Sequence, residues 1–291
     1  MRKILCYVWV VVSANLMMAE IPKAERTALI DIFKATNGDN WTNTWDIDAD
    51  VSNWYGVKVV NDHVTEINLF RNNLNGIIPN SIGAFKELES LNLAFNGITG
   101  ELPTEITELP RLRVLKLEMN RIKGELPENI GALVELEELT AFNNFLTGDI
   151  PDTIGEIKGL KVLNLSSNSL KGSIPKSVGG LVHLESLGLF ENSLEGAIPA
   201  EMGNLVKLKE LVLANNQLGG EVPIEFGQLA SLEVFQIQNN KFNSVKNLEA
   251  MQSHEFLVFD YDREDTKTDF RTVKFNKTRM ADTKFEDDVD N

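Results

Sequence analysis

The chain has 291 residues, of which 43% are hydrophobic and 24% are charged, and its formal net charge is −15. This apolar content is too high for a disordered chain and is sufficient for a sizeable core. The negative charge argues against nucleic-acid binding, which needs a basic surface to displace counterions from phosphates. The single cysteine, Cys6, excludes an intramolecular disulfide and a cysteine-based zinc site.

Residues 1–19 are predicted to be a secretory signal peptide. The basic residues Arg2 and Lys3 precede an apolar run at residues 4–12, which is too short to span a membrane. Cleavage at Ala14 and cleavage at Ala19 both stay open, and an uncleaved anchor is the alternative to a signal peptide. We therefore expect a secreted, periplasmic or cell-surface protein with no membrane span after cleavage.

Residues 20–63 are predicted to form an N-terminal cap that begins with a helix. The helix is expected over residues 24–36. Three apolar residues share one face of it: Leu29, Ile32 and Phe33.

The cap is expected to continue with a hairpin and a group of aromatic residues. Residues 57–60 and 64–69 are predicted to pair across a tight turn at residues 61–62. The end of a stacked structure exposes apolar core and an unpaired strand edge, so a cap must cover both. The residues expected to seal this end are Trp41, Trp45, Trp54 and Tyr55.

Three aspartates in the cap alternate as in a calcium-binding loop: Asp46, Asp48 and Asp50. Such a loop needs Gly at its sixth position and Glu at its twelfth. Val51 and Val57 occupy these positions. A solvated acidic loop is the favoured interpretation, and a structural calcium site is the alternative.

A period of 24 residues dominates the chain after the cap. Apolar residues open the units at Val64, Leu88, Leu112, Leu136, Leu160, Leu184, Leu208 and Leu232. Proline recurs at the same spacing at positions 79, 103, 127, 151, 175, 199 and 223. Seven of the nine prolines therefore share one phase of the repeat, which composition alone does not produce.

Each unit predicts one short strand. In the unit that begins at Leu160, Leu163 and Leu165 alternate with polar or smaller residues, so they are expected to point inward. A single strand cannot bury its apolar face alone, so successive units are expected to stack in parallel around a shared core.

Asparagine and glycine recur at further fixed phases, and we assign both columns a structural role. The asparagines, from Asn72 to Asn240 in steps of 24 residues, fall where the chain leaves each strand. An amide offers two donors and an acceptor, so it can satisfy turn backbone that no strand reaches. The glycines, from Gly76 to Gly220 in the same steps, permit a positive φ.

Residues 64–248 resemble the plant-type leucine-rich repeat, LxxLxLxxNxLxGxIPxxIGxLxx, over eight units. Seven units carry Gly and Pro in phase, and the eighth keeps only its strand half. The cap resembles those that precede such repeats, because residues 54–57 match their Trp-x-Gly-Val element. It lacks the cysteine pairs of plant extracellular members, and residues 37–41 are closer to secreted bacterial members.

The resemblance implies an α/β solenoid, in which a right-handed coil carries a parallel β-sheet on its concave face between two caps. It also implies a protein or peptide ligand, and inhibitors of secreted enzymes are one known use of similar scaffolds. Residues 249–291 are predicted to form the C-terminal cap and an acidic tail. The residues expected to seal this end are Phe256, Leu257, Phe259 and Tyr261.

The sequence offers little for catalysis. The histidines His63, His183 and His254 fall in the cap hairpin, a return arm and the C-terminal cap. A catalytic triad built from them would need coincidences that the repeat does not supply. We therefore predict no enzymatic activity, no cofactor and no metal site.

The outward side of the predicted sheet is the candidate ligand-binding surface. Side chains at these outward positions are not needed to fill the core. Exposed Phe beside carboxylates suits a partner with apolar and basic groups. The candidate residues are Phe70, Phe95, Glu118, Glu138, Phe142 and Phe190. We expect a secreted or cell-surface protein that binds a protein or peptide there noncovalently. The alternatives are a structural or adhesive surface protein and an inhibitor of a secreted enzyme.

Overall fold

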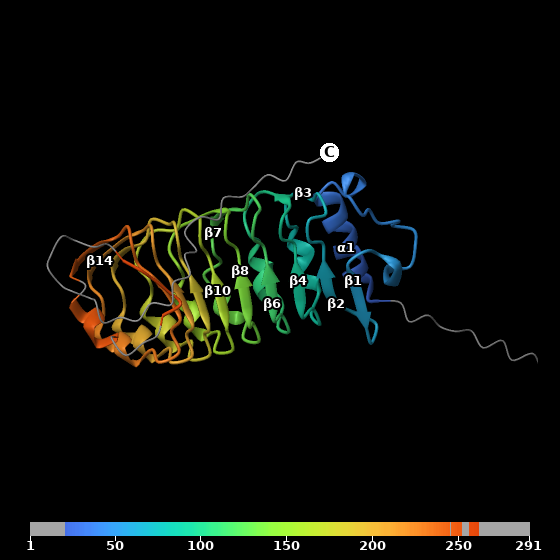
Figure 1. Ribbon diagram of the computed structural model, residues 1–291. Helices are drawn as coiled ribbons and strands as arrows, with labels where there is room; N and C mark the ends of the chain where they lie inside the picture. The colour runs from blue at the N-terminus through green and yellow to red at the C-terminus, as the bar shows by residue number, and fades with distance from the viewer. Residues whose placement is uncertain (1–20, 245, 252–255, 262–291) are drawn as a thin grey trace, which may run out of the picture.

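The computed structural model describes residues 21–244, 246–251 and 256–261. The chain forms an elongated coil whose strands stand side by side along the body, with the N-terminal residues at one end (Figure 1). The predicted signal peptide, His254 and the acidic tail lie outside the described residues. No helix within the described ranges has the length and apolar character needed to cross a membrane.

The cap helix α1 spans Lys23–Ala35, so its prediction is confirmed to within one residue. Its buried face includes Leu29, Ile32 and Phe33, as the periodicity predicts. Thr36 is the C-cap of the helix, and its backbone N–H still makes the helical hydrogen bond to Ile32 O at 3.0 Å. Two short 3-10 turns follow, η1 (Gly38–Asn40) and η2 (Val51–Asn53).

A chain of aromatic contacts fills the cap. The ring centroids of Phe33 and Trp41 lie 5.4 Å apart, and those of Trp45 and Trp54 lie 4.8 Å apart. Trp41 also meets Trp45 edge-on at 4.8 Å. All four side chains are buried, which confirms that the three tryptophans seal this end. Tyr55 is different, because 47% of it stays exposed.

The cap hairpin begins the large sheet. Strands β1 (Val57–Val60) and β2 (His63–Asn68) pair antiparallel, as predicted. Asn61 and Asp62, the two residues between them, both have positive φ values, of 50° and 67°. Two consecutive left-handed residues match the right-handed twist of the flanking strands.

The remaining strands of the large sheet run parallel, and each residue pairs with the one 24 positions later. The sheet has ten strands in the order β1-β2-β4-β6-β8-β10-β11-β13-β15-β17. The parallel strands after β2 are β4 (Ser90–Asn92), β6 (Val114–Lys116), β8 (Glu138–Thr140), β10 (Val162–Asn164), β11 (Ser186–Gly188), β13 (Glu210–Val212), β15 (Val234–Gln236) and β17 (Val258–Asp260).

Strand β17 extends the repeat by one turn beyond the eight predicted units. It pairs with β15 in the same 24-residue register, and Phe235 lies opposite Phe259. Phe256 is buried, and the rings of Phe235 and Phe259 stack with centroids 5.6 Å apart. Leu257, which was expected to help seal this end, is exposed.

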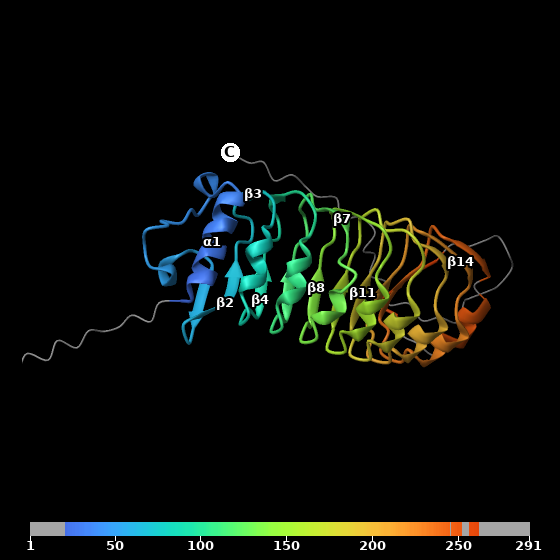
Figure 2. The same cartoon turned by 180° about the vertical axis from the view of Figure 1, so that it is seen from behind.

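Short 3-10 turns and small sheets complete each circuit of the coil. The turns lie side by side along the body when it is viewed from behind (Figure 2). They are η3 (Asn80–Ala84), η4 (Thr104–Glu108), η5 (Ile130–Ala132), η6 (Asp152–Glu156), η7 (Lys176–Gly180), η8 (Ala200–Asn204), η9 (Ile224–Gln228) and η10 (Lys246–Met251).

The small sheets were not predicted from the sequence. They pair short segments just after the asparagine column. Their strands are β3 (Asn75–Gly76) with β5 (Gly97–Ile98), β7 (Lys123–Glu125) with β9 (Phe145–Thr147), and β12 (Glu195–Ala197), β14 (Gln217–Glu221) and β16 (Lys241–Ser244) in a third sheet.

The asparagine column satisfies interior backbone, as predicted. Asn120 Nδ2 donates to Leu93 O and Leu117 O, both at 3.0 Å. Its Oδ1 accepts from Ile98 N at 3.0 Å. Each such asparagine therefore links its own strand end to the preceding unit, and this explains why the fold needs a side chain with both donors and an acceptor.

The helix α1 is tied to the hairpin by an ionisable pair. The buried Glu25 carboxylate contacts His63 Nδ1 at 2.7 Å and accepts from Val64 N at 2.8 Å. The hydrogen bond that His63 donates to Glu25 is the largest cause that raises the pKa of His63 above 6.5, and the charges of Glu25, Glu87 and Asp62 act in the same direction.

A pH-dependent stability contribution follows from this pair. Because the folded-state pKa of His63 is raised, the contribution is fully present below the unfolded pKa and is lost as the pH rises through the folded pKa. We expect His63→Ala to be less stable than the parent below pH 6.5, with the difference shrinking above it. An NMR titration of the His63 ring checks the cause, since Glu25→Gln should return its pKa toward 6.5. An unchanged pKa in that variant would contradict the assignment.

Candidate functional site: the outward face of the large sheet

The outward side chains of strands β2 to β15, and the residues that directly follow each strand, form one surface, here called the sheet face. The inward residues of the same strands are buried leucine, isoleucine and phenylalanine. The sheet face is therefore held on a rigid support, and its side chains differ from one repeat to the next.

The N-terminal end of the sheet face carries two exposed aromatic rings in contact. Phe70 and Phe95 follow β2 and β4, and their ring centroids lie 5.2 Å apart. They are 44% and 42% exposed. Phe95 is held in the left-handed region, at a φ of 57°, by the turn that each repeat makes at this position. Two predicted site residues thus lie together as an accessible aromatic pair.

A hollow of about 520 Å³ lies beside this pair. It is lined by Tyr55, Gly56, Val57, Lys58, Glu66, Asn68, Phe70 and Asn92. Gly56 closes it at the hairpin side, where its carbonyl accepts from Asn68 N at 2.7 Å. A Cβ on Gly56 would lie 2.0 Å from Asn68 O, and its φ is +75°, so only glycine allows this approach. The exposure of Tyr55 is explained by this hollow.

Two asparagines line the hollow from neighbouring strands. Asn68 Oδ1 accepts from Phe70 N at 3.3 Å, and Asn92 Oδ1 accepts from Ala94 N at 3.1 Å. Asn68 and Asn92 are direct partners in the β2–β4 register. The sequence alone does not indicate these two asparagines as site residues, because an outward Asn in one repeat carries no signal until its neighbour in space is known.

The two predicted acidic site residues already have partners within the protein. Glu118 is only 9% exposed, and its carboxylate accepts from Thr140 Oγ1 at 2.6 Å. Glu138 pairs with Lys116, with 2.9 Å between Oε1 and Nζ. The expectation that outward side chains are exposed is therefore wrong for Glu118, because the next strand covers it.

Phe142 and Phe190 are half-buried and lie on separate repeats. They follow β8 and β11, with β10 between these strands. Ser166 occupies the position between them, and its Oγ accepts from Phe190 N at 3.2 Å. The structure thus does not bring these two rings into a single group like that of Phe70 and Phe95.

A row of alternating charges runs along one edge of the sheet. Arg113 Nε donates to Glu137 Oε1 at 2.8 Å, and Lys161 Nζ lies 2.5 Å from Glu137 Oε2. The hydrogen bond from Lys161, followed by that from Arg113, lowers the pKa of Glu137. Lys209 Nζ pairs with Glu185 Oε2 at 2.7 Å further along, so two carboxylates offset two of the three cations in this row.

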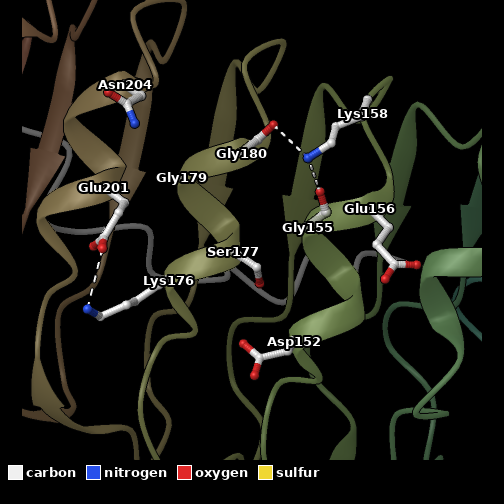
Figure 3. A pocket seen from close by; sticks show the side chains of 10 residues that line it. All are labelled: Asp152, Gly155, Glu156, Lys158, Lys176, Ser177, Gly179, Gly180, Glu201 and Asn204. Atoms are coloured by element: carbon white, nitrogen blue, oxygen red, sulfur yellow. Dashed lines mark hydrogen bonds and ion pairs between the residues drawn. The ribbon is translucent and has the colours of Figure 1, made fainter.

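A second hollow, of about 460 Å³, lies between the turns η6, η7 and η8 (Figure 3). Its cationic groups are already engaged. Lys158 Nζ donates to Gly155 O at 2.5 Å and to Gly180 O at 3.4 Å. Lys176 Nζ pairs with Glu201 at 3.4 Å. Both lysines of this hollow therefore already have partners within the protein.

Asp50 of the aspartate loop and His183 make contacts with nearby residues of the protein. Asp50 Oδ1 accepts from Ser52 N at 2.8 Å and caps η2, and its hydrogen bond from the Ser52 side chain lowers its pKa. His183 Nδ1 lies 2.9 Å from Lys207 Nζ. Across residues 21–244, 246–251 and 256–261, no group of three or more acidic, His or Cys side chains is arranged to hold a metal ion.

Comparison with known families accounts for the 24-residue period. Models of the leucine-rich repeat match residues 134–194, 63–85, 87–109 and 207–229. The chain carries leucine-rich repeats. The predicted leucine-rich repeat fold is thereby confirmed, together with its long sheet of mainly parallel strands. A search of curated proteins gives no match.

Solved leucine-rich repeat structures show the same coil. The ectodomain of the Arabidopsis thaliana receptor kinase GASSHO1/SCHENGEN3, in complex with CASPARIAN STRIP INTEGRITY FACTOR 2, is 33% identical over 81% of this chain, with a TM-score of 0.75. The Arabidopsis HAESA ectodomain, in complex with an IDA peptide hormone, is 27% identical over 81%, with a TM-score of 0.72. A leucine-rich repeat protein of Leptospira interrogans is 34% identical over 64%, with a TM-score of 0.55.

The chain is shorter than these relatives. It covers 30% of the GASSHO1/SCHENGEN3 chain, 41% of the HAESA chain and 46% of the Leptospira chain. The similarity therefore covers less than half of the length of each of these three chains.

Proposed function

We propose that this protein is secreted or displayed at the cell surface and binds a protein or peptide ligand noncovalently through the sheet face. The exposed Phe70–Phe95 pair beside the hollow is the observation that carries the proposal. Aromatic side chains on a rigid support are typical anchors of interfaces, because they bury a large area and lose little conformational freedom. The stacked repeats hold this surface in place before binding, which lowers the entropic cost of association.

The similar structures support this class of ligand. The GASSHO1/SCHENGEN3 and HAESA ectodomains were solved with bound ligands, and the HAESA ligand is a peptide hormone. A basic partner was expected from Glu118 and Glu138, but both carboxylates are engaged within the protein. We therefore propose a mainly apolar contact at the N-terminal end, with Phe142 and Phe190 as secondary contacts further along the sheet face.

The double variant Phe70→Ala/Phe95→Ala tests the proposal. The immobilised protein captures partners from extracellular fluid, and mass spectrometry identifies them. We expect the variant to bind the captured partner at least about tenfold more weakly, because anchor residues contribute about 1–2 kcal/mol each. Its thermal unfolding should change little, since both rings are largely exposed.

A matched control is available on another surface. Phe145 in β9 is 59% exposed and lies on a small sheet, away from the sheet face. Phe145→Ala should leave binding unchanged. Equal losses in the control and in the double variant would mean that the sheet face is not the binding surface. Phe142→Ala is a poorer probe, because its half-buried ring also supports the fold.

A further inference from the structure

The hollow at the N-terminal end of the sheet face is lined by two asparagine amides whose oxygens each already accept a hydrogen bond. The oxygens of Asn68 and Asn92 are both committed to backbone N–H groups of the following turn. Within the described part of the chain, neither Nδ2 group has an acceptor. Each asparagine thus has N–H donors without a partner among the described residues, while its oxygen already accepts one backbone hydrogen bond.

The spacing of these donors suits a single oxygen atom. Asn68 and Asn92 are direct partners on neighbouring parallel strands, which lie about 4.8 Å apart. With the two nitrogens at this strand spacing, an acceptor placed midway and about 1.6 Å above them lies about 2.9 Å from both, which is the usual N–H···O distance. The pair can therefore act as a clamp on one carbonyl oxygen.

The walls of the hollow add an apolar contact and no net charge. Tyr55 and Phe70 line it, and Phe95 packs against Phe70. Lys58 and Glu66 are directly opposite each other in the β1–β2 register, so their charges offset. The net charge of −15 over the chain disfavours a ligand carboxylate.

We infer that the hollow binds an extended peptide segment whose aromatic or branched aliphatic side chain packs on Tyr55 and Phe70, and whose neighbouring main-chain carbonyl is clamped by Asn68 and Asn92. This inference rests on the proposed function and specifies the ligand chemistry at one end of the same surface. A neutral carbonyl satisfies both donors without bringing a charge toward Glu66.

The test starts from a displayed library of random linear peptides selected on the full chain. Selected sequences should share one aromatic or branched aliphatic residue. A synthetic copy is then compared with the same peptide in which the peptide bond after that residue is replaced by a trans-alkene, which removes the carbonyl and adds no charge. Loss of two neutral hydrogen bonds should weaken binding to the parent protein about tenfold or more.

The protein side of the test is the double variant Asn68→Asp/Asn92→Asp. Aspartate keeps the oxygen that accepts from the turn, as Asp50 does with Ser52 N, but removes the donors. We expect at least about tenfold weaker binding of the unmodified peptide, and no further loss when its carbonyl is removed in the alkene peptide. Asn164→Asp is the matched control, because Asn164 Oδ1 accepts from Ser166 N at 3.1 Å in the same column, away from the hollow.

The outcomes separate this inference from the proposed function. Peptides that lose affinity in Phe70→Ala/Phe95→Ala but not in Asn68→Asp/Asn92→Asp would overturn the clamp and leave the sheet face as the binding surface. Equal losses in Asn164→Asp would also overturn the clamp, since the effect would then come from charge alone. A selection in which no peptide responds to either double variant would contradict the proposed function itself.

Discussion

Replacement of Asn144 by alanine is expected to lower the free energy of unfolding by roughly 3 kcal/mol. Asn144 is buried, and its Nδ2 donates to Leu117 O at 3.0 Å and to Ala141 O at 3.1 Å. Its Oδ1 accepts from Ile122 N at 2.9 Å. Alanine leaves Ile122 N without its partner, and an unsatisfied buried group costs about 1–3 kcal/mol. Leu117 O and Ala141 O keep hydrogen bonds from Asn120 Nδ2 and Asn168 Nδ2, so each lost donor there adds about 0.5–1.5 kcal/mol.

Equilibrium unfolding in urea measures this loss, and two further variants define its cause. Asn204→Ala makes the same change at an exposed position and should stay within about 0.5 kcal/mol of the parent. Asn144→Asp keeps an acceptor for Ile122 N but cannot donate to the two carbonyls. A parent-like stability for Asn144→Asp would show that the donated hydrogen bonds do not support the coil.

Replacement of Gly179 by alanine is expected to cost about 2–3 kcal/mol through overpacking. Gly179 lies in η7, beside the next turn, η8 (Figure 3). A Cβ there would lie 2.3 Å from Glu201 O and 2.5 Å from Glu201 C. These are backbone atoms of the neighbouring repeat, so neither can move without separating the two turns.

The adjacent glycine provides the control for this second variant. A Cβ on Gly180 would meet Lys158 Nζ at 2.9 Å, which is the flexible end of a side chain. Gly180→Ala should therefore leave the urea midpoint almost unchanged, whereas Gly179→Ala should lower it clearly. Equal midpoints for the two variants would mean that the turns can separate at little cost.

At the C-terminal end, the repeat motif did not predict the last parallel strand, β17. Strand β17 keeps the 24-residue phase, with Phe256, Phe259 and Tyr261 at positions that hold leucine, phenylalanine and isoleucine one unit earlier. Gly and Pro are missing from the preceding return arm, so the unit resembled a cap instead of a ninth strand. The 24-residue spacing of apolar residues predicts this strand without the Gly and Pro positions, because the core needs apolar volume and not leucine as such.

The candidate site was predicted only in part for a related reason. Phe70 and Phe95 were recognised because alternation along a strand determines which side chains point outward. The burial of Glu118 depends on Thr140, and the role of Asn68 depends on Asn92, in both cases a residue of the neighbouring strand. The same outward position is therefore exposed in one repeat and covered in the next.

The amino-acid sequence by itself determined the 24-residue coil, the parallel register of its strands, the asparagine column and the cap helix and hairpin. These features repeat or are local, so periodicity and turn chemistry specify them. Only the tertiary structure decided that Tyr55 lines a hollow, that Phe70 and Phe95 form a pair, and that two asparagines of neighbouring strands line the same hollow. Such arrangements arise between side chains that stacking brings within a few ångströms, and a single strand carries no information about its neighbour's side chains.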